Sequence, residues 1–198
     1  MLKRLFDILV SGIMLVLLSP VFLVFALRIK GYDHGPVFYR GTRTGLHGKQ
    51  FRIYKFRSMV VDAEKTGVMS TSKNDDRITP VGHFLRNTKL DELPQLINVF
   101  VGDMSFVGPR PEVKKFTDLY TDEEKVLLNI RPGMTDYASI WNIDEGEVLK
   151  DSQDPDGDYF RLIRPEKIRL QLKYYNEMSL WTDIKILLLT ARKMVLKY

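Results

Sequence analysis

The chain has 198 residues, which suits one domain with a substantial core and is short for two full domains. It contains no cysteine, which excludes a disulfide framework and thiolate metal ligands and fits a reducing compartment. The formal net charge of +5 at pH 7 suits nucleic acid, an anionic membrane face or phosphorylated substrates, so charge alone does not choose among these partners.

The first element is an apolar segment from Leu5 to Leu27. A straight helix of that length rises roughly 35 Å, enough to cross a hydrocarbon core of about 30 Å. However, Ser19 and Pro20 interrupt the segment, and proline bends a helix because it removes a backbone donor. Cations flank both ends of the segment, and the positive-inside tendency then favours the cytoplasm for both ends. The flanking cations are Lys3, Arg4, Arg28 and Lys30. The residues alone leave a spanning helix and a re-entrant helix as equal alternatives.

Aromatic and β-branched residues dominate the next stretch, from Val37 to Arg57. The segments "VFYR" and "FRIYKFRSM" flank "GTRTGLHGKQ", and this pattern predicts a β-hairpin with a long loop. Lys55 and Arg57 are two residues apart in the second strand and should share one face. The polar segment from Asp62 to Pro80 predicts a loop with a short helix.

The stretch "LDELPQLINVFVG" places two adjacent acids ahead of a predicted helix. Pro94 suits the first helical turn, and apolar residues recur from Leu93 to Phe100 before Gly102. Asp91 and Glu92 then lie at the helix N-terminus, where the macrodipole and the unpaired amides favour anions. Capping is the ordinary reason for such acids, so the pair alone is weak evidence for catalysis.

Cations in neighbouring motifs strengthen the case for a site at this acid pair. "GPRP" holds Arg110 between two prolines, in a stiff loop that suits a preorganised anion contact. "RPG", which begins at Arg131, is a second such turn, and its simplest interpretation is a plain turn. The candidate phosphate-binding cations are Lys55, Arg57, Arg86, Arg110 and Arg131.

The C-terminal third contains a capping box, an acidic segment and a long helical pattern. "TDEE", from Thr121 to Glu124, is a capping box that opens a helix. The acidic segment from Asp144 to Tyr159 lacks the spacing of an EF-hand and predicts a solvated loop. From Arg164 onward, an amphipathic pattern allows either a helix in the membrane surface or a helix that faces the core. Its predicted apolar face contains Ile184, Leu187, Leu188, Ala191 and Val195.

Several common site motifs are absent from the sequence. "GLHGKQ" departs from a P-loop, because Arg43 stands at the first glycine position and Gln50 follows Lys49. There is no Rossmann glycine fingerprint, no GxSxG elbow, no zinc spacing among the histidines and no nucleic-acid-reading motif. The acid pair with its cations is the candidate site that remains.

The motifs "YKFRSM", "LRNTKLDELPQLINVFVGDMSFVGPRP" and "RPGMT" together resemble the monotopic phosphoglycosyl transferases, bacterial sugar transferases that initiate glycoconjugate assembly on polyprenyl phosphate. The resemblance covers nearly the whole chain. It implies transfer of a sugar phosphate from a UDP-sugar to membrane-bound polyprenyl (undecaprenyl) phosphate, with release of UMP. It also implies a mainly helical α+β fold, with a re-entrant membrane anchor at residues 1–30 and a catalytic domain at residues 31–198 on the cytoplasmic side of the bacterial inner membrane.

The resemblance also implies roles for the acid pair. Asp91 would be the nucleophile that holds the phosphosugar covalently, and Glu92 would bind Mg²⁺. Nearby cations should lower the pKa of Asp91 and keep it ionised. Mg²⁺ usually binds through one or two carboxylates together with phosphate oxygens, and the cations would neutralise the diphosphate.

Two positions depart from the pattern of the family. Asp136 stands where many relatives have glycine, and Gln171 stands where an aspartate is common, so the identity of the sugar stays open. Two rival hypotheses also stay open. The first is direct transfer through a ternary complex, with Asp91 as general base. The second is a non-enzymatic, membrane-tethered module that binds anionic lipid or a partner protein.

Overall fold

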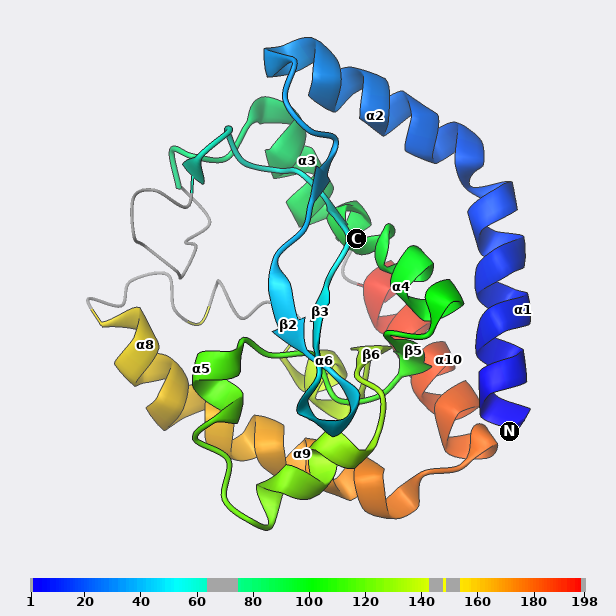
Figure 1. The fold of residues 1–198 in the computed structure, drawn as a ribbon, viewed down its shortest axis with the longest axis vertical. Coiled ribbons are helices and arrows are strands. Elements are labelled where there is room, and N and C mark those ends of the chain that lie inside the picture. Colours follow the sequence, from blue (N-terminus) through cyan, green and yellow to red (C-terminus); the bar gives the residue numbers. More distant parts are fainter. Residues whose placement is uncertain (1, 64–74, 143–147, 149–153, 197–198) are drawn as a thin grey trace.

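A computed structural model describes residues 2–63, 75–142, 148 and 154–196, and these residues form a mainly helical α+β fold with small two-stranded sheets, as predicted (Figure 1). The α-helices are α1 (Leu2–Leu17), α2 (Ser19–Asp33), α3 (Pro80–Asn87), α4 (Gln95–Val101), α5 (Lys114–Thr117), α6 (Tyr137–Trp141), α8 (Pro155–Asp158), α9 (Arg164–Glu177) and α10 (Leu180–Leu196). The strands are β1 (Phe38–Tyr39), β2 (Thr42–Thr44), β3 (Gln50–Arg52), β4 (Lys55–Phe56), β5 (Ser105–Val107) and β6 (Gly133–Thr135). Tighter or wider helical turns are η1 (Leu46–Gly48), η3 (Leu90–Glu92), η4 (Glu124–Asn129) and η5 (Tyr159–Ile163). Most of the predicted loops at 62–80 and 144–159 lies outside the described residues.

The apolar N-terminal segment is a pair of helices that meet at the predicted kink. α1 ends at Leu17 and α2 begins at Ser19, with Pro20 in its first turn. The Ser19 hydroxyl donates to the Val16 carbonyl at 2.8 Å. Of the described helices, none is long and apolar enough to cross a membrane alone, whereas α1 and α2 meet that standard together, bent by 60°. The kink is confirmed, and α2 continues to Asp33, past the predicted anchor boundary at residue 30.

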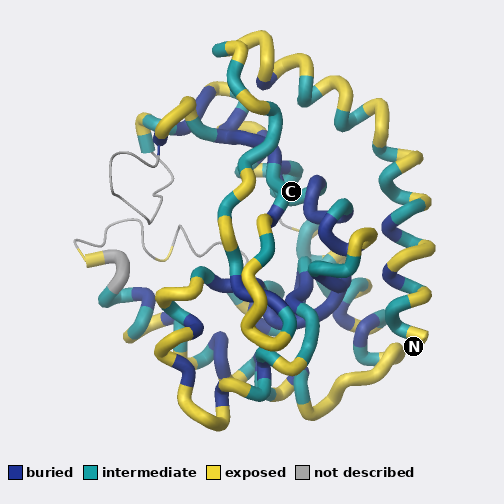
Figure 2. The backbone as a smooth tube through the Cα atoms, in the orientation of Figure 1, coloured by how far each residue is buried: buried dark blue, intermediate teal, exposed yellow. Residues whose placement is uncertain are grey.

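α1 exposes apolar residues on its outer side and buries two polar residues; Figure 2 shows its alternation of buried and exposed positions. Asp7 and Ser11 are buried, whereas Leu5 and Ile13 are more than half exposed. Asp7 Oδ1 accepts a hydrogen bond from the Phe106 backbone N–H at 3.2 Å. Apolar side chains of α1, among them Phe6, also pack against the core. The helix is therefore apolar on both its inner and its outer sides, which suits an outer side that meets an apolar medium.

The segment from Val37 to Arg57 forms the predicted hairpin. β1 pairs antiparallel with β4, β2 pairs antiparallel with β3, and η1 lies in the loop. Phe56 is buried against Ile29 of α2 and Leu85 of α3, so the hairpin is fixed to both helices. β4 ends at Phe56, so Lys55 and Arg57 do not form one strand face as expected.

The main core lies where α4, β5, α9 and α10 meet. It contains Leu96 and Val99 of α4, Val107 of β5, Tyr174 of α9 and Ile186 of α10, all essentially inaccessible to solvent. Burial of this apolar surface is the dominant favourable contribution to folding. The core therefore fixes α4, which follows the acid pair directly, against the C-terminal helices.

β5 and β6 form a parallel pair that brings the two arginine–proline motifs together. Ser105 lies opposite Gly133 in the register. A Cβ atom on Gly133 would lie 2.1 Å from the Gly108 nitrogen, and one on Gly108 would lie 2.4 Å from the Arg131 carbonyl oxygen. Only glycine permits this approach of the two backbones. The "GPRP" loop is therefore held against the "RPG" turn.

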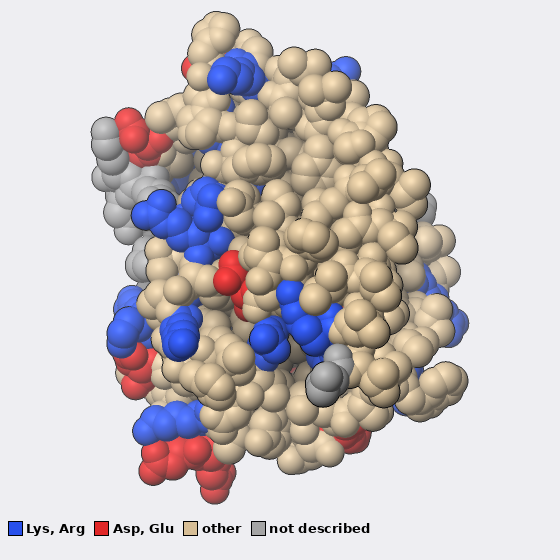
Figure 3. Space-filling view, turned by 45° about the vertical axis from the view of Figure 1, so that its right-hand side comes forward, with Lys and Arg blue, Asp and Glu red and all other residues tan. Residues whose placement is uncertain are grey.

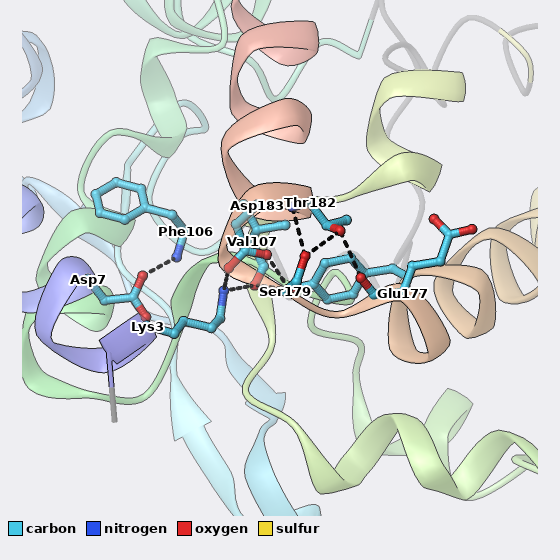
Figure 4. A network of polar contacts seen from close by, with 9 residues as sticks. Lys3, Asp7, Phe106, Val107, Glu177, Ser179, Thr182 and Asp183 are labelled. Atoms are coloured by element: carbon cyan, nitrogen blue, oxygen red, sulfur yellow. Dashed lines mark hydrogen bonds and ion pairs between the residues drawn. The ribbon is translucent and has the colours of Figure 1, made fainter.

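A polar network joins the start of α1 to β5 and α10 (Figure 4). Lys3 donates to the Val107 carbonyl at 3.0 Å and to Asp183 Oδ2. Tyr174 Oη donates to Asp183 Oδ1 at 2.7 Å. Both carboxylate oxygens of Asp183 therefore have donors, and the network fixes α1 to the core.

The predicted capping box is confirmed. The Thr121 N–H donates to Glu124 Oε2 at 3.0 Å, and the Glu124 N–H donates to Thr121 Oγ1 at 3.3 Å. The helix that it opens is the 3₁₀ turn η4.

The predicted apolar face of α10 is mostly turned away from the core. Leu188, Ala191 and Val195 are exposed, whereas Asp183 and Ile186 are buried. Ile184 and Leu187 are half-buried, and Leu187 packs against the main core, so the predicted face is divided between the core and the surface. Figure 3, which brings the side of α1 forward, shows a broad uncharged surface beside a smaller area where acidic and basic side chains gather.

Candidate active site

Asp91 and Glu92 lie in η3, directly before α4, as the sequence predicts. Lys89, which precedes this turn, has a φ of 57°, in the left-handed region that non-glycine residues rarely adopt. Leu90 and Leu93 pack against the apolar cluster beneath α2 and α3. The acid pair is thus held in a tight turn between two apolar contacts, with Asp91 buried and Glu92 partly exposed.

Glu92 forms ion pairs with two cations from distant segments. Lys55 Nζ, on β4, donates to Glu92 Oε1 at 2.7 Å. Arg110, in the "GPRP" loop, donates through Nη1 to Oε2 at 3.1 Å and through Nη2 to Oε1. Burial opposes the charge on Glu92, but Arg110 and then Lys55 outweigh it and hold the pKa of Glu92 well below its usual range. Glu92 is therefore a carboxylate at neutral pH.

Asp91 differs from Glu92 in its hydrogen bonds and in the direction of its pKa shift. Its side chain is buried, and none of the residues that the structure describes donates a hydrogen bond to its carboxyl group. Burial raises the pKa of Asp91; Lys55 acts against this rise, and the negative charge of Glu92 adds to it. The cations lower this pKa, as expected, but the net shift is upward, opposite to the expected direction, because desolvation exceeds their effect.

Arg86 is a third cation beside the acid pair. Its Nε donates to Ser58 Oγ at 2.8 Å, and the residue lies in the last turn of α3. Burial lowers the pKa of Arg86, and the charge of Asp91 acts in the opposite direction. Three predicted cations, Lys55, Arg86 and Arg110, are therefore close enough to act electrostatically on Asp91.

The other two predicted cations contact different partners. Arg57 donates to both carboxylate oxygens of Asp33 and to the Pro36 carbonyl at 2.6 Å, and its hydrogen bonds lower the pKa of Asp33 to about 2. Arg131 Nε donates to the Gly102 carbonyl at 2.9 Å. Neither contact involves the acid pair, so a phosphate-binding role for these two arginines stays a prediction.

A cavity of about 630 Å³ lies beside the acid pair. Glu92, Lys89 and Arg110 contribute charged groups to its lining, and apolar residues of α1, α4, β5 and α10 form much of the remainder. Its volume falls in the range of small-molecule sites. Apolar walls strengthen electrostatic interactions because they lower the local dielectric. The cavity therefore suits a ligand that has both a charged part and an uncharged part.

Sequence analysis missed three lysines that line this cavity, Lys89, Lys167 and Lys193. The position of Lys89, close to the acid pair in sequence, could have marked it as a candidate site residue. Lys167, on α9, is buried; its Nζ lies 2.7 Å from Glu112 Oε1 and donates to Tyr159 Oη at 3.0 Å. No local pattern marks Lys167, because its partner comes from a distant segment.

The acid pair offers suitable ligands for Mg²⁺. Among the described residues there is no group of three or more metal-binding side chains. Mg²⁺ needs fewer, because it commonly takes one or two carboxylates and completes its shell with water and substrate phosphate. Asp91 and Glu92 supply such oxygen donors. Lys55 and Arg110 would have to leave Glu92 for that carboxylate to bind an ion.

Carboxylates surrounded by lysine and arginine beside an apolar cavity define a class of site that handles phosphorylated ligands at an apolar surface. The family model for bacterial sugar transferases matches residues 1–197, and the chain belongs to that family. The family predicted from the motifs is thereby confirmed.

The chain is similar to several sugar transferases, two of which are named for a specific activity. The chain is 40% identical over 198 residues to the UDP-glucose:undecaprenyl-phosphate glucose-1-phosphate transferase of Escherichia coli, an alignment that covers 98% of this chain and 40% of the relative. It is 38% identical over 206 residues to the undecaprenyl-phosphate galactose phosphotransferase of Salmonella typhimurium, with 96% and 40% covered. It is 35% identical over 195 residues to the uncharacterized sugar transferase EpsL of Bacillus subtilis, with 98% and 87% covered. The chain thus spans about two fifths of the first two relatives.

Proposed function

We propose that this chain transfers a sugar 1-phosphate from a UDP-sugar to undecaprenyl phosphate, releases UMP, and uses Asp91 as a covalent nucleophile at the start of glycoconjugate synthesis. Transfer of a sugar phosphate to undecaprenyl phosphate is the activity in the names of the E. coli and Salmonella relatives. The observation that carries the proposal is the contrast within the acid pair. Glu92 is occupied by two cations, whereas Asp91 is buried among cations and receives no hydrogen bond from the described part of the chain.

In the first step, an Asp91 carboxylate oxygen attacks the phosphorus that bears the sugar. A bond forms between this oxygen and phosphorus, and the bond from phosphorus to the bridging oxygen of the diphosphate breaks. The electron pair of the broken bond leaves with UMP. The attack needs ionised Asp91, and Lys55, Arg86 and Arg110 favour that state against the effect of burial.

In the second step, a phosphate oxygen of undecaprenyl phosphate attacks the same phosphorus. The bond between Asp91 and phosphorus breaks, which restores the carboxylate and leaves the sugar on a lipid diphosphate. Lys55 and Arg110, which pair with Glu92 in the free protein, are the side chains that would turn to the phosphate oxygens. Mg²⁺ bound by Glu92 would supply further neutralisation of the diphosphate charge.

We also propose that α1 and α2 form a re-entrant anchor in the cytoplasmic face of the bacterial membrane, with the catalytic domain from residue 31 onward in the cytoplasm. Three features support this location: the 60° bend between the helices, the exposed apolar side of α1, and the exposed Leu188 and Val195 of α10. Such an anchor would hold the acid pair near the headgroup level, where a prenyl chain leaves its phosphate.

A single-turnover experiment tests the covalent route. Protein reconstituted in bilayer nanodiscs receives a UDP-sugar and Mg²⁺, but no undecaprenyl phosphate. We expect release of about one equivalent of UMP, and a gain of one sugar phosphate in mass on the peptide that contains Asp91. Asp91→Asn should give neither signal, whereas Asp118→Asn, which changes an exposed acid, should match the wild type. UMP release that requires added lipid would instead support direct transfer through a ternary complex.

A metal titration tests the role of Glu92. The Mg²⁺ concentration that gives half-maximal rate should rise in Glu92→Gln, because one anionic ligand is lost. The exposed-acid variant Asp118→Asn serves as the control. Turnover that survives complete chelation of divalent ions would contradict the assignment of Mg²⁺.

A further inference from the structure

Asp136 and Gln171 are two fully buried polar residues that contact each other. Gln171 Nε2, on α9, donates to Asp136 Oδ2 at 3.3 Å, and both residues are 0% exposed. The two positions that the sequence analysis set apart are therefore parts of a single buried contact.

Asp136 also holds the start of α6. Its Oδ1 accepts hydrogen bonds from the Ser139 N–H at 2.6 Å and from the Ser139 hydroxyl at 2.7 Å. At the other end of α6, Lys193 of α10 donates to the carbonyls of Ile140 and Trp141. α6 has only 5 residues and therefore little stability of its own. Its position depends on these contacts with α9 and α10.

α6 forms part of the cavity wall. The cavity-lining residues on this segment are Ala138, Ser139, Ile140, Trp141 and Asn142. Asn142 Nδ2 is buried and has no acceptor among the residues that the structure describes. Asn142 lines the cavity, so rotation of its side chain would let this unpaired donor bind an oxygen of the ligand. The hydroxyl groups of a hexose and the carbonyl groups of a nucleobase both supply such oxygens.

We propose that Asp136 and Gln171 act as one positioning pair that fixes α6 and, through the Asn142 amide, selects the sugar of the nucleotide-sugar donor. The inference rests on the proposed function. Discrimination between sugar epimers requires hydrogen-bonding groups held in fixed positions, because an epimer moves one hydroxyl away from its partner. The Asp136–Gln171 contact holds α6 in place from outside the cavity, and the Asn142 amide contacts the sugar.

Isosteric substitutions test whether the two residues act as one unit. Gln171→Glu places a second carboxyl group against Asp136 in the interior, so we expect a lower Tm and a higher KM for the UDP-sugar. The double variant Asp136→Asn/Gln171→Glu again has one acid and one amide, with their places exchanged, and should recover most of both losses. Thermal unfolding measures this coupling without any need for turnover. If the changes in Tm and KM of the double variant equal the sums of those of the single variants, the two residues do not act as one unit.

A donor panel tests the sugar contact. Each protein receives UDP-glucose, UDP-galactose and their N-acetylamino counterparts, with undecaprenyl phosphate and Mg²⁺. In Asn142→Ala and Gln171→Glu, the preference for the best donor over its epimer should fall about tenfold, with inhibition by UMP unchanged. Leu127→Ala, in a separate apolar cluster, should lower Tm and leave the preference intact.

Three results would contradict this assignment or a part of it. An unchanged epimer preference in Asn142→Ala, together with weaker inhibition by UMP, would assign the α6 wall to the nucleotide rather than the sugar. Absence of turnover by the wild type on every donor would contradict the proposed function, and the sugar-selecting role with it. An active wild type without coupling between positions 136 and 171 would overturn the positioning pair alone.

Discussion

Two polar clusters in this protein each hold a buried acid beside a cation, and their surroundings differ. The site cluster lies beside the cavity and consists of Lys55, Arg86, Asp91, Glu92 and Arg110. The brace cluster joins α1 to α10 and consists of Lys3, Tyr174 and Asp183 (Figure 4). In the brace cluster, both oxygens of the buried acid have donors. In the site cluster, one buried acid has none among the described residues, and its neighbour borders a cavity. A charged cluster is thus equipped for chemistry when one of its groups lacks a partner and a ligand has room beside it.

The two arginine–proline motifs show the same contrast at shorter range. Arg110 and Arg131 lie on backbones that touch at Gly108 and Gly133. Arg110 follows β5 and reaches Glu92, whereas Arg131 precedes β6 and donates to the Gly102 carbonyl. The Gly133 N–H donates to the Pro109 carbonyl at 2.9 Å, so the two motifs lie against each other although their guanidinium groups reach different partners. Similar local sequences therefore deliver their guanidinium groups to different places.

The largest expected effect is that of Asp91→Asn. We expect kcat to fall on the order of 10³-fold or more, because the amide is not a nucleophile. Tm should not fall, since the raised pKa of Asp91 means that its charged form is disfavoured by burial. UMP release and thermal unfolding of reconstituted protein check both points. Full turnover in this variant would show that Asp91 is neither the nucleophile nor a general base, and a large loss of Tm would place Asp91 with the brace cluster.

The next effect separates the two arginine–proline motifs. Arg110→Ala should lower kcat/KM about 100-fold, because a fixed, forked donor to phosphate is lost. Arg131→Ala should change kcat/KM by less than about threefold, because Arg131 contacts a backbone carbonyl away from the acid pair. Steady-state kinetics on the same donor compare the two variants. Equal losses would remove the distinction and return Arg131 to the phosphate site.

A change in the brace cluster should affect stability rather than chemistry. Asp183→Ala should lower the free energy of unfolding by about 2 kcal/mol, because Tyr174 and Lys3 lose their shared acceptor. The expected loss of stability is modest because the Lys3 side chain is 35% exposed, so solvent screens part of the ion pair. Denaturant titration measures the loss, and kcat per folded molecule should stay within about twofold. A fall in kcat with unchanged stability would contradict the structural role.

The smallest effect is a shift along the pH axis. Because burial raises the pKa of Asp91, kcat/KM should decline on the acid side at a higher pH than it would for an ordinary aspartate. The decline follows protonation of Asp91 as pH falls, whereas Glu92 stays ionised over that range because its pKa is depressed. Arg86→Gln should move the decline to still higher pH, since Arg86 acts to lower this pKa. An acid limb at the same pH in both proteins would show that Arg86 does not act on the titrating group.

The sequence by itself determined the features that depend on a few adjacent residues. The kink at Ser19-Pro20, the Thr121–Glu124 capping box and the acid pair ahead of α4 are local patterns, because their hydrogen bonds close within about one helical turn. The family followed from a long, continuous motif. These predictions hold whichever segments of the chain pack nearby.

Only the tertiary structure decided which charges meet and which charges are buried. Lys55 and Glu92 are separated by 37 positions in the chain, and Asp136 and Gln171 by 35, so no local pattern pairs them. The sign of the Asp91 pKa shift and the outward face of α10 depend on how much water the folded chain excludes at each position. Desolvation and long-range contacts arise from packing of the whole chain, and a reading of sequence neighbours does not contain them.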